Sequence, residues 1–271
     1  MKNSEAVSQK PIPFFQVDAF TRDAFAGNPA AVCMLDDWLD DVTLQHIACE
    51  NNLSETAFVV KRDDAYELRW FTPVVEVDLC GHATLASACV LFMHYHDPNT
   101  ELRFLTRSGV LTVRRSGEQY VLNFPLVEPV KIATPPGLLA ALGIKGVAVE
   151  TWQASDIVVV IDDESLLDSL SPDFPALARF VTRGVVVCAA SERFDFRSRW
   201  FGPRVGVNED PITGSAHTFL TPLWAQKTGK RELVAQQGGE RKGEIGCRLA
   251  ENDRVELCGH ARLIIEGSLF L

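Results

Sequence analysis

A stretch that occurs twice decides the fold of this chain: RWFTPVVEVDLCGHA at residues 69–83 and RWFGPRVGVNEDPITGSAH at residues 199–217. The segments that precede the two copies also correspond. AAVCMLDDWLDD from Ala30 and IVVVIDDESLLD from Ile157 are both apolar runs that lead into Leu-rich helical spacing. Repetition at half the chain length indicates two similar units, because a solenoid would need three or more short repeats.

Each unit is predicted to run strand, helix, strand, strand, helix, with further short strands after it. The fold class is therefore α+β, and the predicted domains are residues 11–129 and 130–271, with the final strand free to pack back on the first half. Residues 82–96 are apolar almost all round, which predicts an enclosed core helix. The counterpart helix contains Pro222, which we expect to kink it or to end its first segment.

Composition excludes several classes of partner. The net charge of −10 opposes a nucleic-acid partner, because affinity for a phosphate backbone comes from clustered Lys and Arg. The chain has no apolar run of about 18 residues to span a membrane, and its first ten residues, MKNSEAVSQK, do not lead into a signal-type region. Seven cysteines without paired spacing favour reduced thiols. We expect a soluble, cytoplasmic protein without a membrane partner.

The repeated stretch predicts a binding site for an anion. In each copy an extended strand runs into a glycine, Gly81 or Gly214, that opens a helix. The first N–H groups of a helix lack internal partners and its dipole is positive there, so a glycine that admits ligand atoms makes an anion site. If a pseudo-twofold axis relates the halves, the two helix ends face each other across a cleft, where a small carboxylate would bind.

Titratable residues flank both helix ends and differ between the copies, which suggests an asymmetric substrate. They are His82 at the first end and Glu209 with Asp210 at the second. Glu55 opens an apolar strand, where Val, Ile or Thr is the usual choice, and burial there would raise its pKa and suit it to proton transfer.

Four motifs together resemble the PhzF-like phenazine-biosynthesis isomerase/epimerase family: GNPAAV, NLSETAF, CGHATLAS and EDPITGSAH, in that order. The resemblance runs from about Phe14 to the end of the chain. It implies the diaminopimelate-epimerase fold, with two pseudo-symmetric domains that are each a β-barrel-like sheet wrapped around a central helix. It also implies an active site between the domains and a homodimer.

The resemblance further implies a cofactor-independent isomerase that moves a proton between carbons of a small carboxylate, in the manner of trans-2,3-dihydro-3-hydroxyanthranilate isomerase, without a metal. Carried onto this chain, the proton-transferring glutamate matches Glu55, and the assisting residues match His82 and Asp210. The implied substrate-binding residues are Gly81, Gly214, Ser215, Ser54, Asn28, Cys80 and Thr213.

Cys80 leaves two alternatives open. A thiolate at a helix N-terminus has a lowered pKa, so Cys80 could act as the base of an amino-acid epimerase or racemase. Its mate in the second copy is Thr213, whose hydroxyl is too weak an acid for the same work, which disfavours a symmetric two-thiol enzyme. The other alternative is a non-catalytic protein that binds carboxylates in the same cleft.

Overall fold

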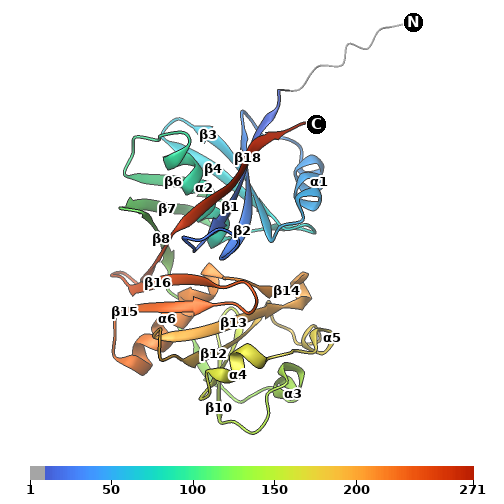
Figure 1. Ribbon diagram of the computed structural model, residues 1–271, viewed down its shortest axis with the longest axis vertical. Helices are drawn as coiled ribbons and strands as arrows, with labels where there is room; N and C mark the ends of the chain where they lie inside the picture. The colour runs from blue at the N-terminus through green and yellow to red at the C-terminus, as the bar shows by residue number, and fades with distance from the viewer. Residues whose placement is uncertain (1–9) are drawn as a thin grey trace, which may run out of the picture.

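A computed structural model describes residues 10–271 of the chain (Figure 1). Residues 1–9, on which the prediction of no signal-type segment largely depends, lie outside the described residues. Between residues 10 and 271, none of the helices combines the length and the apolar character that a membrane crossing requires.

The first part of the chain forms the upper part of the molecule in Figure 1 and contains two helices. Its elements are β1 (Ile12–Ala19), β2 (Asn28–Leu35), α1 (Asp41–Asn51), β3 (Glu55–Arg62), β4 (Ala65–Phe71), β5 (Glu76–Val77), α2 (Gly81–Met93), β6 (Glu101–Thr106), β7 (Gly109–Ser116) and β8 (Gln119–Pro125).

The later part lies below it, except for its last strand β18, which extends into the upper part, and it follows a similar order with two additional α-helices. Its elements are β9 (Val130–Ile132), α3 (Leu138–Leu142), β10 (Val149–Gln153), β11 (Ile157–Ile161), α4 (Ser165–Ser169), α5 (Phe174–Leu177), β12 (Val185–Ala190), β13 (Phe196–Gly202), the 3-10 turn η1 (Pro203–Val205), β14 (Val207–Asp210), α6 (Gly214–Thr228), β15 (Glu232–Gln237), β16 (Gly243–Leu249), β17 (Arg254–Gly259) and β18 (Ala261–Leu269).

The α+β class predicted from the sequence is confirmed, and the two parts share a strand plan. β2 pairs in parallel with β3, and β11 pairs in parallel with β12, while β4 and β13 follow as antiparallel neighbours. The parts are joined by the C-terminal strands, since β17 pairs with β8 and β18 pairs with β1 from Ile12 to Ala19. The division into domains 11–129 and 130–271 stays a prediction, because strand pairing continues across it.

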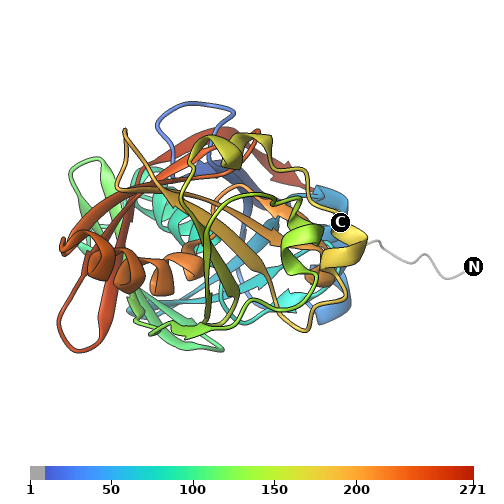
Figure 2. The same ribbon diagram turned by 90° about the horizontal axis from the view of Figure 1, so that it is seen from below.

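Each parallel pair is buried on both faces. In the first part, Val32 and Val59 pack into a core with α2, whereas Cys33 and Val60 face α1. In the second part, Val158 and its alternate neighbours pack with α6, while the opposite face is covered by α3, α4 and α5, which lie on the outside of the strands in Figure 2. The predicted core helix is confirmed, because α2 is buried from Gly81 to Phe92.

The expectation was that Pro222 would kink its helix or end the first segment of it. The second outcome is wrong, because α6 runs unbroken from Gly214 to Thr228, whereas a kink stays a prediction. Proline has no N–H to donate to the carbonyl four residues earlier, which is that of Thr218. The backbone N–H of Val127 donates to this Thr218 oxygen instead, at 3.2 Å. The segment after β8 therefore satisfies the group that the proline leaves free.

Candidate active site

The N-termini of α2 and α6 meet. A Cβ added to Gly81 would lie 3.3 Å from the Cα of Gly214, and a Cβ added to Gly214 would lie 3.3 Å from the Cα of Gly81. Neither glycine has a positive φ, so close approach, not backbone conformation, is what favours glycine at both positions. The N-cap side chains of Cys80 and Thr213 do not cap the helices, and in α6 the N–H of Ala216 bonds the Thr213 carbonyl, so that the N–H groups of Gly214 and Ser215 are the ones left for a ligand.

A cavity of about 420 Å³ opens beside the two helix ends. Its volume is within the usual range for small-molecule sites. Most of the lining residues come from the two copies of the repeated stretch, and two others are Glu55 at the start of β3 and Arg183 just before β12. The full lining is Glu55, Thr72, Val75, Glu76, Val77, Asp78, Leu79, Cys80, Gly81, His82, Arg183, Trp200, Val205, Val207, Asp210, Thr213, Gly214 and Ser215.

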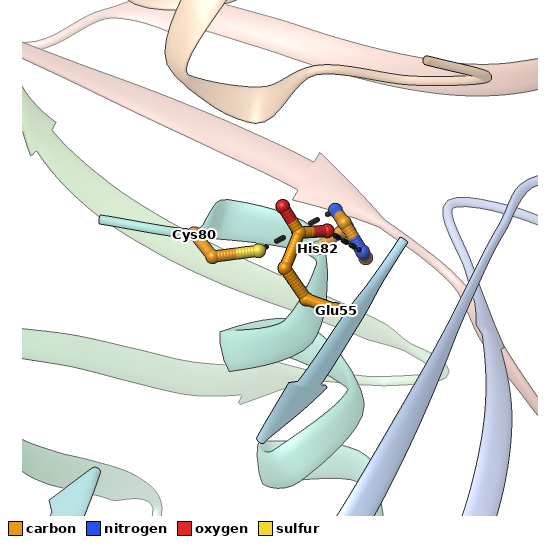
Figure 3. A group of neighbouring side chains, drawn as sticks. All are labelled: Glu55, Cys80 and His82. Carbon is orange, nitrogen blue, oxygen red and sulfur yellow. Dashed lines mark hydrogen bonds and ion pairs between the residues drawn. The ribbon is translucent and has the colours of Figure 1, made fainter. Parts of the chain in front are cut away.

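The three proposed catalytic residues, Glu55, His82 and Asp210, all line this cavity. Glu55 extends from the start of β3 over the first turn of α2, where Cys80 and His82 lie (Figure 3). Glu55 Oε2 lies 3.1 Å from His82 Nε2, at ion-pair distance. Neither atom has a partner with hydrogen-bond geometry within residues 10–271, although both are buried. Buried polar atoms of this kind are unusual in a native protein and are typical of a site that receives a ligand.

Asn28 connects the two sides of the site. Its Nδ2 donates to Asp210 Oδ1 at 2.6 Å and to the Ile212 carbonyl at 3.1 Å, and lies 3.1 Å from His82 Nδ1. Asp210 also accepts a hydrogen bond from the Thr213 hydroxyl at 2.5 Å. The two amide hydrogens of Asn28 therefore hold the Asp210 carboxyl group and the Ile212 carbonyl beside His82.

The neighbours of His82 raise its pKa. Burial lowers the pKa of His82, but Cys80 and Glu55 beside the ring outweigh burial, so the net shift is upward from the ordinary value. Burial also raises the pKa of the Cys80 thiol, to about 11, so this thiol is neutral near pH 7.

Asp210 titrates near neutral pH. Burial raises its pKa to about 6, although the positive charge of His82 and hydrogen bonds from Thr213 and Asn28 act in the opposite direction. A carboxyl group with a pKa in this range is suited to general acid or base chemistry.

Ligand atoms of Glu55, Cys80 and His82 lie within 4.8 Å of one another, which raises the question of a metal site. The contacts are made to opposite edges of one imidazole ring, since Glu55 lies at Nε2 and Cys80 Sγ lies 3.5 Å from Nδ1. One ion cannot bind both ring nitrogens, so a shared metal would require the ring contacts to be broken. The arrangement fits a proton-transfer cluster better than a metal centre.

The other predicted residues have different surroundings. Ser54 precedes Glu55 but is not among the cavity's lining residues. Glu209 points away from the site, where it forms a bidentate pair with Arg199 at 2.7 Å. Arg69 and Glu76 form the matching pair in the first copy, at 2.7 and 2.8 Å. The repeated arginine thus fixes the strand that leads to each helix end.

Two residues near the cavity were missed by sequence reasoning. Arg183 lines the cavity and pairs with the buried Asp156. The register of the repeat is the signal that could have found them, because Asp156 and Arg183 precede β11 and β12 much as Asn28 and Glu55 open β2 and β3.

Comparison with known proteins identifies relatives along almost the whole chain. The family model for phenazine biosynthesis-like proteins (PhzC-PhzF) matches residues 17–267. A Pseudomonas aeruginosa protein named as an uncharacterized isomerase is 58% identical over 260 residues, which cover 96% of this chain and 99% of that protein.

Solved structures share the fold. The crystal structure of a phenazine biosynthesis protein of the PhzF family from Enterococcus faecalis has a TM-score of 0.92 and 43% sequence identity, and the match covers 97% of this chain and 100% of that one. A predicted epimerase from Pseudomonas aeruginosa has a TM-score of 0.74 at 22% identity, with 96% and 99% of the two chains covered. The second likeness shows the epimerase-like fold alone.

Proposed function

Because the chain belongs to the phenazine biosynthesis-like (PhzC-PhzF) family and is an isomerase, we propose that it moves a proton between two carbons of a small carboxylate substrate. The observation that supports this most directly is the contact between Glu55 and His82 beside two helix ends that meet. The cavity there combines a proton acceptor with uncapped donors for an anion.

In the proposed reaction, the carboxylate of Glu55 removes a proton from one substrate carbon. The C–H bond breaks, and its electron pair moves into an enolate- or dienolate-like system conjugated with the substrate. The protonated Glu55 then returns the proton to a different carbon, so that no atom is gained or lost and no cofactor is needed. General base and acid catalysis of this kind contributes about 10²–10⁴-fold.

The developing negative charge would be stabilised by groups that are already in place. The first turns of α2 and α6 meet at Gly81 and Gly214, and a protonated His82 in the first turn of α2 would add positive charge there. Each helix end stabilises an anion by about 0.3–1 kcal/mol, and by up to about 2 kcal/mol when partly buried. Glu55, whose Oε2 lies 3.1 Å from His82 Nε2, would keep His82 oriented for this role.

Proton exchange with solvent tests the proposal. The protein is incubated in D₂O with cyclic dienoic acids and α-amino acids, and carbon-bound deuterium is measured by NMR. An isomerase that uses a solvent-exchangeable carboxyl group incorporates deuterium into at least one of these acids. Binding of the acids with no exchange in any of them would favour the non-catalytic carboxylate-binding alternative.

The epimerase alternative requires Cys80 as a base, and the surroundings of Cys80 argue against it. The thiol is buried and its pKa is raised to about 11, so it is protonated at neutral pH. The residue opposite it, Thr213, has a hydroxyl in place of a thiol and donates its hydrogen to Asp210.

We also propose, from the family resemblance, that the protein is a cytoplasmic homodimer. Sedimentation equilibrium measures its mass directly. A mass of about twice that of one 29.9 kDa chain is expected, and a mass of one chain at micromolar concentration would contradict the proposal.

A further inference from the structure

The cavity lining includes a polar cluster around Arg183 that the proposed reaction does not use. Arg183 donates through Nε and Nη2 to the two carboxylate oxygens of Asp156, at 2.8 and 2.5 Å. Its Nη1 donates to the Ser215 hydroxyl at 2.9 Å, at the N-terminus of α6. Trp200 Nε1 donates to the same Asp156 carboxylate at 2.8 Å.

Packing fixes this cluster. Asp156 is completely buried, and its carboxylate receives three hydrogen bonds. The guanidinium of Arg183 lies over the Trp200 ring, 5.6 Å from its centroid. A Cβ on Gly184 would come within 2.4 Å of that ring, so the glycine beside Arg183 admits the indole. The direction of the guanidinium is therefore set before any ligand binds.

Part of the guanidinium remains available to a ligand. Arginine has five N–H donors, of which Asp156 takes two and Ser215 takes one, so that two are left. The side chain is 37% exposed and lines the cavity. The Ser215 hydroxyl accepts from Arg183 and keeps its own hydrogen to donate.

The charge of the cluster decides what it would bind. Asp156 neutralises Arg183, and the cavity already contains the acidic residues Glu55 and Asp210. A second substrate anion would gain little attraction here and would be repelled by those acidic groups. An uncharged carbonyl oxygen accepts the two remaining N–H groups without that repulsion.

We infer that Arg183 is a specificity-determining residue that hydrogen-bonds an uncharged carbonyl oxygen of the substrate, while the substrate carboxylate lies at the two helix ends. The inference rests on the proposed function, because it takes the carboxylate site as given. It assigns the substrate to a class, monocarboxylates with a second, neutral acceptor oxygen. Glu55 then moves the proton, and Arg183 selects the substrate.

Binding of matched six-carbon acids tests this inference. Hexanoate, 4-oxohexanoate, 5-oxohexanoate and adipate are titrated into the full-length protein, and Kd values are measured by NMR. At least one oxo acid is expected to bind roughly tenfold more tightly than hexanoate, the effect of one added hydrogen bond to a charged group. Adipate is expected to show no such gain. Equal affinities of hexanoate and both oxo acids would overturn the inference, whereas failure of hexanoate itself to bind would overturn the carboxylate site of the proposed function.

Variants separate the role of Arg183 from general effects on folding. In Arg183→Met, the preference for the oxo acid, expressed as the ratio of the hexanoate Kd to the oxo-acid Kd, is expected to disappear. The double variant Asp156→Asn/Arg183→Met avoids leaving a buried carboxylate unpaired, and it is expected to lose the preference in the same way. A preference that survives in the double variant, folded as judged by circular dichroism, contradicts the inference.

Asp156→Asn alone provides a test in the opposite direction. The amide oxygen can still accept from Trp200 and from Nη2 of Arg183, while Nε of Arg183 loses its acceptor and the positive charge of Arg183 is no longer neutralised. Adipate is then expected to gain roughly tenfold in affinity relative to hexanoate. An unchanged ratio of adipate to hexanoate would mean that Arg183 does not face the bound acid.

Discussion

Asp210 is a buried carboxyl group whose ionisation should control the binding of a carboxylate ligand. Its pKa is about 6, because burial disfavours the charged form. A bound anion nearby raises that pKa further, so the protonated form of the site binds the anion more tightly. The affinity for hexanoate should therefore rise as the pH falls through 6, by roughly tenfold between pH 7.5 and pH 5.5.

The matched variant for this prediction is Asp210→Asn. Asparagine can still accept from Asn28, and its amide can donate to the Thr213 hydroxyl, so the network of hydrogen bonds is kept without the charge. The pH dependence of the hexanoate Kd, measured by titration calorimetry, should be lost in the variant. An equally steep dependence in Asp210→Asn would assign the effect to a different group.

Individual site residues were predictable where a motif marks them. Glu55, His82 and Asp210 stand in NLSETAF, CGHATLAS and EDPITGSAH, and all three line one cavity. The connecting role of Asn28 was not predictable, because its contact to Asp210 joins residues 182 positions apart in the chain. Arg183 was missed for a related reason. The residues that fix its side chain are Asp156, just before β11, and Ser215, in the first turn of α6, and both are distant from it in sequence.

At the scale of the elements, the contact between the two helix ends should be intolerant of a single methyl group. In Gly81→Ala the new Cβ would lie 3.3 Å from the Cα of Gly214, closer than ordinary van der Waals contact. The helix ends would have to move apart, at a cost of about 1–3 kcal/mol in stability. We expect at least a tenfold loss of hexanoate affinity and a lower Tm, measured by NMR titration and thermal denaturation.

Two comparisons sharpen this test. Gly214→Ala should behave like Gly81→Ala, because the contact is reciprocal. Gly267→Ala in β18 serves as the control, since a Cβ there would meet no atom within 4 Å, and it should leave both quantities unchanged. Wild-type hexanoate affinity in Gly81→Ala would show that the first-turn N–H groups do not bind the carboxylate.

The buried helix was predictable from its sequence, whereas the effect of Pro222 on its helix was not. Residues 82–96 are apolar on almost every side of the predicted helix, and a helix of this kind must be enclosed by protein. The prediction is confirmed for α2, which is buried from Gly81 to Phe92. Pro222 led to the wrong expectation of a helix end, since the sequence does not show that the N–H of Val127 satisfies the carbonyl of Thr218. This donor outside the helix offsets part of the free-energy cost of a proline within a helix.

At the scale of the whole molecule, the two halves should unfold together. α2 and α6 belong to one hydrophobic core cluster, and the sheet crosses between the halves through the pairs β8–β17 and β1–β18. Differential scanning calorimetry should therefore give a single transition whose calorimetric and van't Hoff enthalpies agree. Two resolved transitions would show instead that residues 11–129 and 130–271 are independent folding units.

The repeated stretch predicted the similar strand plan of the halves but not their connection. Local patterns identify strands by alternation and turn residues, and β6, β7 and β8 form the antiparallel meander that such patterns indicate. Pairing between β8 and β17 leaves no local signal, because each strand could equally pair with another edge. Long-range pairing had to come from the three-dimensional structure.

Deuterium exchange in Glu55→Gln tests the central claim most directly. The amide of glutamine keeps the size of the side chain but cannot accept the substrate proton, so the rate of deuterium incorporation into a reactive acid should fall by about 10²–10⁴-fold. Cys80→Ser, measured beside it by NMR in D₂O, should retain most of the wild-type rate. Exchange that persists in Glu55→Gln and is lost in Cys80→Ser would contradict the account and make the thiol the base.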